Sequence, residues 1–505
     1  MNTTALRALL PAFLQQRINQ VLATPIGGRL ARGAFWSLLG TTLSKVCSTI
    51  SWVVVGRMLG KDSFGELNMV QNTVGMFGAA AGLGMGMAAS KYVAEYRRTD
   101  PARAGRFIGL ASIATWVTSG LLAVVLAFLA PWLARETLAA PHLATQLAVS
   151  SLLLLFSGVA GAQQGTLVGF ESFKAIATIN VIIGVTSFPM LLAGAFMGGV
   201  GGALWALVAS AVLNCLLNYF HVRREAAANH VVVRYRGCMS EARVFWHFNL
   251  PSVLNTIFNA VVVWAVGAML VRYSNGFGDL GIYNAVQRMR LIPENIAAIL
   301  LAPMLPVMSE IFARRDMTAY ARALQVCFTM ATLAIVPAAL VQIAAPWLTL
   351  LPYGAQYQGG EPVVLWVMVA TVSYALLWPM GNILISMGRI WFALIVGTVH
   401  NVLSLALCWW LVPRFGAAGL ALATSVSFVI ASSPCVVLLQ RSLPDLLRQV
   451  RWYRMSVILV SLLVVCGTAA RMLMPTPSLM VGILAALLFV CWRAHPATNR
   501  PLAVP

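Results

Sequence analysis

The residues with the clearest chemical potential lie in one apolar stretch, residues 281–311, which reads GIYNAVQRMRLIPENIAAILLAPMLPVMSEI. It is long enough to cross a bilayer, yet it carries Arg288, Arg290 and Glu294. Arg290 and Glu294 are four residues apart and can pair on one helical face. Arg288 lies about 200° from Arg290, on the side of Asn284, because a helix turns about 100° per residue. Charge at membrane depth is costly, so this second face predicts a cavity that binds an anion.

A second cation, Lys45, lies in the first predicted span on a face rich in hydroxyl groups. Serine and threonine also help helices to pack closely, but packing does not account for a lysine at mid-membrane. The second and seventh spans carry further polar stripes, which predicts a shared hydrophilic cavity with cationic fixed charges. The candidate substrate-binding residues are Lys45, Arg288, Arg290, Arg57, Ser48, Asn72, Asn255, Asn259 and Asn284.

Acidic residues are scarce in the predicted interior, where Glu294 is the one clear carboxylate. It is the candidate coupling residue for H⁺ or Na⁺, and its simpler role is to neutralise Arg290. The sequence has no paired-carboxylate site, no Ser/His/Asp set and no Walker motif, so we expect neither an enzyme nor an ATP-driven pump. Eight scattered cysteines without a CxxC pair, and no HExxH motif, predict no disulfide, metal site or cofactor.

Composition indicates a membrane protein. The chain has 505 residues, of which 60% are hydrophobic and 10% charged, and its mean hydropathy is +0.83. A soluble protein of this composition could not cover its surface with polar groups. We therefore predict an all-α polytopic membrane protein. The net charge of +20 does not indicate nucleic-acid binding, since the basic residues form short clusters between apolar spans.

Apolar length predicts about fourteen transmembrane helices. With the amino terminus inside, 25 of the 34 lysines and arginines fall in inside segments, six in outside segments and three within spans. This distribution follows the positive-inside rule and predicts that both termini are cytoplasmic. We expect no cleavable signal peptide. The predicted spans are 33–56, 67–90, 106–130, 145–169, 176–198, 201–222, 245–272, 281–308, 322–345, 361–387, 390–412, 416–439, 455–474 and 478–493.

The longest internal linker divides six spans from the next six. Both halves open with a polar-striped span followed by a charged one, and two six-helix lobes around a central cavity are the arrangement of an alternating-access transporter. Two C-terminal helices would then be an appendix. The predicted parts are a cytoplasmic amphipathic segment 1–28, an N-lobe 29–222, a cytoplasmic linker 223–244, a C-lobe 245–440, and a connector with the last two helices and the tail, 441–505.

Several segments resemble a known family. ARGAFWSLLGTTLSKV, VVVGRMLGKDSFGELNMVQNTVGMFGAAAGLGMGMAASKYVAEYR, DPARAGRFIGL, LGIYNAVQRMRLIP, LLAPMLPVMSE and LPYGAQYQGGEPVV are similar, in this order, to bacterial lipid-linked oligosaccharide flippases of the O-antigen type. The resemblance covers roughly residues 29–440. It implies the fold of the multidrug/oligosaccharidyl-lipid/polysaccharide exporter superfamily.

The resemblance also implies roles for the two cations. The related lipid II flippases carry a basic residue after a serine in the first span, where this chain has Ser44 and Lys45, and an arginine shortly before a proline of the eighth span, which matches Arg288. By resemblance both residues would contact a substrate pyrophosphate. Lipid II flippases have an Arg-Asp pair deeper in the first span, where this chain has Ser51-Trp52, and this favours another oligosaccharide-lipid.

The predicted function is therefore a flippase that moves an undecaprenyl-pyrophosphate-linked oligosaccharide, an O-antigen (lipopolysaccharide) or exopolysaccharide repeat unit, across the bacterial cytoplasmic (inner) membrane. The alternatives are a lipid II flippase or a multidrug/cation antiporter of the same superfamily, and, in a different class, a polytopic polysaccharide polymerase or glycosyltransferase. The expected partners are the lipid-linked oligosaccharide, membrane lipids, and the polymerase or glycosyltransferase machinery, and no nucleic acid. The sequence leaves open the glycan, the coupling ion and the oligomeric state.

Overall fold

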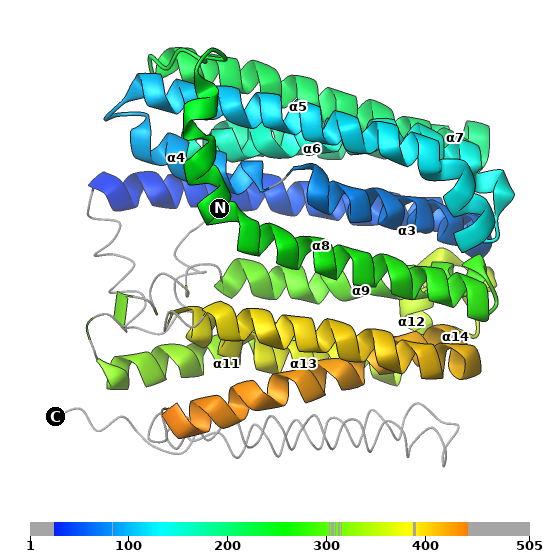
Figure 1. Cartoon of the computed structure of the whole chain (residues 1–505). Coiled ribbons are helices and arrows are strands. Elements are labelled where there is room, and N and C mark those ends of the chain that lie inside the picture. The colour runs from blue at the N-terminus through cyan, green and yellow to red at the C-terminus, as the bar shows by residue number, and fades with distance from the viewer. Residues whose placement is uncertain are drawn as a thin grey trace. The chain divides into compact units, whose positions relative to one another are not determined.

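The computed structural model describes residues 25–442, except 83, 302–303, 305–307, 309, 312–313, 315 and 387–389. These residues form α-helices joined by short connections, and they contain no strand (Figure 1). The predicted all-α class is thus confirmed. The main helices are α3 (Pro25–Ala81), α4 (Met85–Tyr96), α5 (Pro101–Trp132), α6 (Ala144–Gly169), α7 (Phe173–Ala228), α8 (Ala242–Tyr273), α9 (Phe277–Leu301), α11 (Met317–Ala344), α13 (Glu361–Ser386) and α14 (Ile390–Ser442).

Three long helices are interrupted at glycines where the sequence predicts the boundary between two spans. The backbone leaves the helical region at Gly60 in α3, at Gly198 and Gly199 in α7, and at Gly416 in α14. Three of these four glycines have positive φ, a conformation that glycine adopts without strain.

Two of these interruptions are reversals of the chain. A methyl group at Gly202 would lie 2.0 Å from the carbonyl oxygen of Gly194, and one at Gly419 would lie 2.4 Å from that of Leu411. Residues eight positions apart in a straight helix are separated by about 12 Å, at about 1.5 Å per residue. The contacts therefore require α7 and α14 each to fold back as two helices.

The membrane-spanning character is confirmed for the described residues. Six helical stretches there are long and apolar enough to cross a membrane, or seven if α3 and α4, which are bent 43° apart, form one span. The last two predicted spans, 455–474 and 478–493, and nearly all of the predicted surface segment 1–28, lie outside the described residues. The total of fourteen stays a prediction.

The chain divides into two compact units. The first contains residues 1–52, 74–131 and 144–257, and the second contains residues 53–73, 132–143 and 258–505. Two short segments of the predicted N-lobe therefore pack within the second unit. The division into lobes at the linker stays a prediction.

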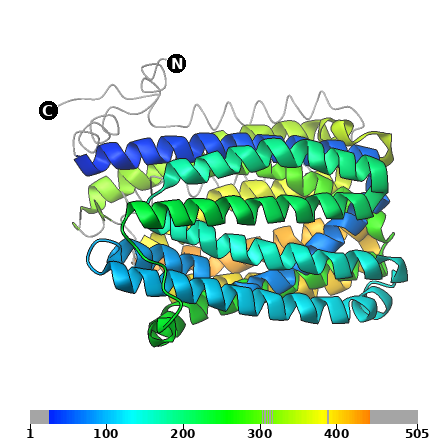
Figure 2. The same cartoon turned by 90° about the horizontal axis from the view of Figure 1, so that it is seen from above.

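The described core of the first unit joins α4, α5, α6 and α7 around small and branched side chains. Helices α6 and α7 pack along each other, and in both views the long helices within this unit run side by side (Figure 1, Figure 2). A methyl group at Gly165 would lie 2.0 Å from the Gly86 carbonyl oxygen, so α4 and α6 are in backbone contact, as small residues permit. The buried cluster consists of Val93, Ala104, Ile108, Leu167, Phe170, Ile176, Ile179, Val222, Ala226 and Val231.

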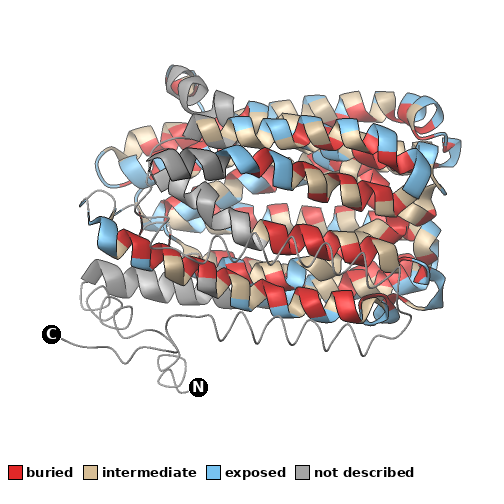
Figure 3. Cartoon of the chain, turned by 90° about the horizontal axis from the view of Figure 1, so that it is seen from below, coloured by how far each residue is buried: buried red, intermediate tan, exposed pale blue. Residues whose placement is uncertain are grey.

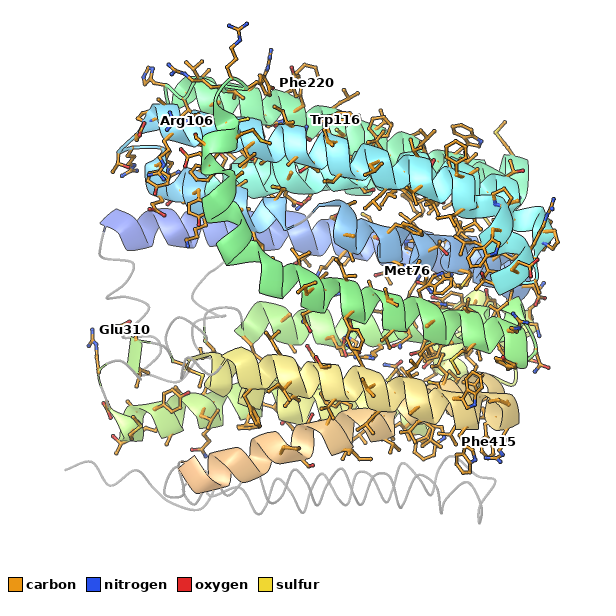
Figure 4. The ribbon with its side chains drawn as sticks, in the orientation of Figure 1. Met76, Arg106, Trp116, Phe220, Glu310 and Phe415 are labelled. Carbon is orange, nitrogen blue, oxygen red and sulfur yellow. The ribbon has the colours of Figure 1, made fainter. Side chains whose placement is uncertain are left out.

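The helices carry buried stripes on one side and exposed apolar side chains on the other (Figure 3). Trp116 and Phe220 project outward from the first unit, and Phe415 from the second (Figure 4); their exposed fractions are 46%, 63% and 58%. Such side chains are stable in contact with lipid and unfavourable in water. This pattern supports a multi-pass membrane protein.

The connection between α7 and α8 is fastened to the start of α5. Helix α7 extends to Ala228, so the predicted linker 223–244 begins with helix and its extended part is shorter. The backbone N–H of Arg234 donates to the Gly105 carbonyl at 3.1 Å. Farther on, the buried Glu241 accepts hydrogen bonds from Arg103 at 3.1 Å and from Arg106, which is labelled in Figure 4, at 3.1 Å. The linker is therefore a fixed strap across one end of α5.

Glycines on α5 make this strap possible, which gives the first prediction. A methyl group would lie 2.0 Å from the Val232 carbonyl oxygen in Gly105→Ala and 2.1 Å from that of Arg234 in Gly109→Ala. Glycine-to-alanine changes inside helices otherwise stabilise by about 1 kcal/mol. We expect both variants to lower the thermal unfolding midpoint in detergent. The matched control is Gly120→Ala on the same helix, which meets nothing within 4 Å and should leave the midpoint unchanged or raised.

Candidate functional site

The guanidinium group of Arg288 is oriented by two amide side chains of α3. Its Nη2 atom donates to Asn68 Oδ1 at 3.1 Å and to Gln71 Oε1 at 3.4 Å. Asn68 is buried, and its own amide nitrogen donates to the Phe64 carbonyl at 2.7 Å. Both acceptors are neutral amides. They fix the direction of the guanidinium group without cancelling its positive charge.

Two glycines bring α3 and α9 close enough for these contacts. A methyl group at Gly65 would lie 1.9 Å from the Phe277 carbonyl oxygen, and one at Gly281 would lie 2.0 Å from that of Lys61. Any side chain at either position would force the helices apart. Asn68 follows Gly65 by about one turn and Arg288 follows Gly281 by about two turns. The reciprocal glycine contact thus sets the position of the Arg288 site.

Two buried tyrosines lie beside this site. Tyr353 and Tyr357 come from the short 3₁₀ turns η4 (Leu351–Tyr353) and η5 (Ala355–Tyr357), which follow α12 (Pro346–Leu350). The Tyr353 hydroxyl donates at 3.3 Å to the carbonyl of Ala285, about one turn before Arg288, and the Tyr357 hydroxyl donates to the Gly56 carbonyl at 2.9 Å. Their relative exposures are 1% and 0%. Burial raises the pKa of both hydroxyls, so both are neutral donors.

The other predicted charges of α9 point to different neighbours. Arg290 Nε lies 2.6 Å from Glu294 Oε1, the pair that the four-residue spacing predicts. Its Nη1 donates to Gln287 Oε1 at 3.2 Å. Arg288 and Arg290 are two residues apart and have separate partners. The helix therefore carries two polar faces, as the sequence predicts.

The remaining candidates are placed in several environments. Lys45 and Ser48 are exposed on α3 in the first unit. In the second unit Asn72 is half-buried, and its amide nitrogen would lie 3.6 Å from a methyl group at Gly267. The substrate-binding roles stay predictions. Of the others, Arg57 and Asn259 are exposed, Asn255 is half-buried, and the half-buried Asn284 donates to the Leu280 carbonyl of its own helix at 2.9 Å.

Sequence reasoning missed three residues around Arg288, namely Asn68, Gln71 and Tyr353. Asn68 and Gln71 are visible in the sequence as part of the polar stripe of the second span, which predicts a wet face but not a partner for a particular arginine. Nothing in the LPYGAQY segment indicates that a tyrosine from a connection lies beside α9.

The sequence matches the family described as polysaccharide biosynthesis protein over residues 30–312. The chain belongs to this family. Its matched region includes both Lys45 and Arg288. No curated protein matches the sequence at a significant level.

Comparison with solved structures of other proteins shows which fold this chain has. The chain is similar to the lipid II flippase MurJ in an inward closed conformation, with 14% identity, a TM-score of 0.65, and coverage of 89% of this chain and 98% of that chain. An inward-facing multidrug resistance MATE family transporter of the MOP superfamily matches with 14% identity, a TM-score of 0.64, and coverage of 82% and 99%. The MATE multidrug transporter DinF-BH matches with 18% identity, a TM-score of 0.62, and coverage of 83% and 96%.

The family is one of polysaccharide biosynthesis, and the fold is the one shared by the solved MurJ and MATE structures. The resemblance seen in the sequence is thereby confirmed for the polysaccharide biosynthesis family and for the fold. At these identities the structural matches establish the fold alone. The substrate has to be argued from the residues of this chain.

The tyrosine contacts give the second prediction. In Tyr357→Phe the carbonyl of Gly56 loses its 2.9 Å donor, and the loss of a buried hydrogen bond costs about 1–3 kcal/mol. We expect a lower thermal unfolding midpoint at neutral pH. Tyr235→Phe, in which the residue is 52% exposed, is the matched control and should not change it.

Alkaline pH adds a second readout to the same variant. The raised pKa of Tyr357 means that its stabilising contribution is complete below the unfolded pKa of about 10 and is lost as pH rises above it. Phenylalanine cannot ionise. Stability should therefore fall less steeply above about pH 10 in Tyr357→Phe than in wild type, and an equal fall in both proteins would contradict the placement of this hydroxyl.

Proposed function

We propose that this protein is a flippase that moves an undecaprenyl-diphosphate-linked oligosaccharide from the cytoplasmic to the outer leaflet of a bacterial inner membrane by alternating access. The diphosphate is held by cationic side chains, and polar stripes wet the sugar. The lipid tail stays in the bilayer. Cationic side chains beside polar stripes suit a substrate that has an anionic diphosphate and, next to it, a polar sugar.

The observation that carries the proposal is the environment of Arg288. An arginine within an apolar span is costly, and residues of this kind usually have a function. Here Asn68 and Gln71 orient it with neutral acceptors, and the nearby Tyr353 hydroxyl is also uncharged. Arginine forms strong, charge-assisted hydrogen bonds with phosphate oxygens. A diphosphate offers several oxygen atoms that such a guanidinium group can contact.

Within the superfamily, the charges favour this substrate class over the alternatives. A transporter of cationic drugs needs an anionic cavity, whereas Lys45 and Arg288 are cationic. For lipid II, the related flippases carry an Arg-Asp pair where this chain has Ser51-Trp52. Neither Ser51 nor Trp52 carries a charge. Ser51 is buried, and its hydroxyl donates to the Cys47 carbonyl of its own helix at 2.7 Å. These differences support an oligosaccharide-lipid other than lipid II.

The location and partners follow from the same proposal. The distribution of lysine and arginine favours cytoplasmic termini. A lipid-linked repeat unit that is moved in this direction must be made on the cytoplasmic side and used on the other. Polymerase and glycosyltransferase machinery are therefore the expected functional neighbours.

The third prediction tests the diphosphate site by binding. Purified undecaprenyl-diphosphate oligosaccharide should bind the wild-type protein and should bind the Lys45→Ala/Arg288→Ala variant at least tenfold more weakly, because each lost charge-assisted contact is equivalent to about 1.5–3 kcal/mol. Flipping in proteoliposomes should be lost in the same variant.

The control for this experiment is Arg98→Ala/Arg224→Ala. Both of these arginines are exposed, and the double change removes the same net charge without touching α9 or the first half of α3. Equal binding by wild type and by Lys45→Ala/Arg288→Ala would place the diphosphate site elsewhere. An equal loss of binding in both double variants would show that the weaker binding comes from the lower net charge of the protein and not from a specific site.

A further inference from the structure

The strap between α7 and α8, residues 229–241, turns both apolar and cationic side chains to its outer surface. Val232, Tyr235 and Met239 are 67%, 52% and 73% exposed, and Arg234 and Arg236 are exposed among them. Single exposed apolar side chains are normal on a protein surface, but three within eight residues are unfavourable in water. This surface therefore favours a partner that has both apolar and anionic groups.

The rest of the strap is packed against the first unit. Val231 and Cys238 are 4% and 2% exposed, and Val231 belongs to the buried cluster of that unit. The Arg234 N–H donates to the Gly105 carbonyl at 3.1 Å, and the buried Glu241 holds the far end of the strap through its two arginine partners. The outward direction of the exposed side chains thus follows from the way in which the strap is fastened.

The contacts with α5 also set the depth of the strap. A methyl group at Gly105 would lie 2.0 Å from the Val232 carbonyl oxygen, and one at Gly109 would lie 2.1 Å from that of Arg234. Gly109 is about 12 Å along the helix from Pro101, at about 1.5 Å per residue. The strap therefore lies beside the first turns of an apolar span, at the level where headgroups give way to acyl chains. Tyrosine is enriched at this level, and long cationic side chains reach from it to the headgroups.

The surroundings of the strap are positively charged. Residues 91–106, 171–174 and 223–241 together contain ten lysines and arginines and five acidic residues. The Glu241 carboxylate is shared by two arginines of α5, which leaves one positive charge in excess. Figure 4 shows Arg106 at the end of the first unit where many nitrogen-bearing side chains gather. The positive-inside rule predicts that this end faces the cytoplasmic leaflet, which carries anionic lipid.

We propose that the outer surface of the strap is a binding site for an anionic phospholipid of the cytoplasmic leaflet. The headgroup phosphate accepts charge-assisted hydrogen bonds from Arg234 and Arg236, and the acyl chains lie against Val232, Tyr235 and Met239. A soluble anion has no acyl chain, and a zwitterionic lipid has no net charge, so each matches only one part of this surface. Because the strap is fastened to α5, the bound lipid fixes the depth of this end of the first unit in the leaflet.

The other possible occupants fit the strap less well. A soluble acidic protein can approach the arginines, but apolar side chains at headgroup depth are in the membrane and not in water. The parts of this chain at its two ends are themselves basic. Residues 1–24 contain two arginines and no acidic residue, and residues 443–505 contain six arginines and one acidic residue. Their charge disfavours a place on a cationic strap.

The fourth prediction removes the charge of the strap with Arg234→Gln/Arg236→Gln. The side chains are exposed and the contact with Gly105 is made by the backbone, so the strap should stay fastened. In native mass spectra of the detergent-purified protein, phosphatidylglycerol should bind this variant about tenfold more weakly than wild type. Binding by wild type should weaken as the salt concentration rises. Phosphatidylcholine with the same acyl chains should bind both proteins weakly and equally.

The matched control is Arg98→Gln/Arg224→Gln, which removes the same charge from exposed positions of the first unit outside the strap. It should bind phosphatidylglycerol with close to the wild-type affinity, and an equal loss in both double variants would overturn the proposal. Tyr235→Ser/Met239→Ser keeps every charge and should also weaken binding. Wild-type affinity in that variant would show that the acyl chains do not lie on the strap.

Amide hydrogen exchange locates the bound lipid and separates it from a free anion. Phosphatidylglycerol should slow exchange in residues 230–240 of wild type and not in Arg234→Gln/Arg236→Gln. Inorganic phosphate should neither slow this exchange nor displace the lipid; displacement would identify a simple anion site and overturn the assignment, as would protection confined to other segments. Lys45 and Arg288 are unchanged in all these variants, so the result is independent of the proposed diphosphate site.

Discussion

The arrangement around α9 depends on the need to stabilise a guanidinium group within an apolar span. Water cannot solvate Arg288 as it would at a surface, so hydrogen-bond acceptors must come from another part of the protein. Asn68 and Gln71 provide them, and this requires α3 and α9 to be in backbone contact. Gly65 and Gly281 make that contact possible. The polar site and the glycine packing are therefore one structural feature.

The choice of acceptors gives the site its chemistry. A carboxylate cancels the charge of the arginine that it contacts, as Glu294 does for Arg290. Amide oxygens orient the guanidinium group and leave it able to attract an anion. The same helix thus contains one arginine that pairs with a carboxylate and one that donates to two amide oxygens. The second arrangement is the one on which the proposed diphosphate site depends.

Helical periodicity explains what the sequence could predict. Spacings along one helix determine which residues share a face, so the Arg290–Glu294 pair and the opposite placement of Arg288 follow from residue numbers alone. Apolar length likewise located the spans, and the interruptions at Gly60, Gly199 and Gly416 fall where the sequence places their boundaries. The partners of Arg288, the tyrosines of the 353–357 connection and the strap on α5 depend on contacts between distant segments. Periodicity carries no information about those contacts.

The two polar faces of α9 have different neighbours. Arg290 and Glu294 pair with each other at 2.6 Å, and the ring centroid of Tyr374 on α13 lies 5.9 Å from the Arg290 guanidinium carbon. Arg288 instead donates to Asn68 and Gln71 of α3. Residues two positions apart on a helix point to nearly opposite sides, because each residue turns the helix by about 100°. One helix can therefore hold an ion pair toward one set of neighbours and place a second arginine toward another set, and these two environments are set by different contacts between distant segments.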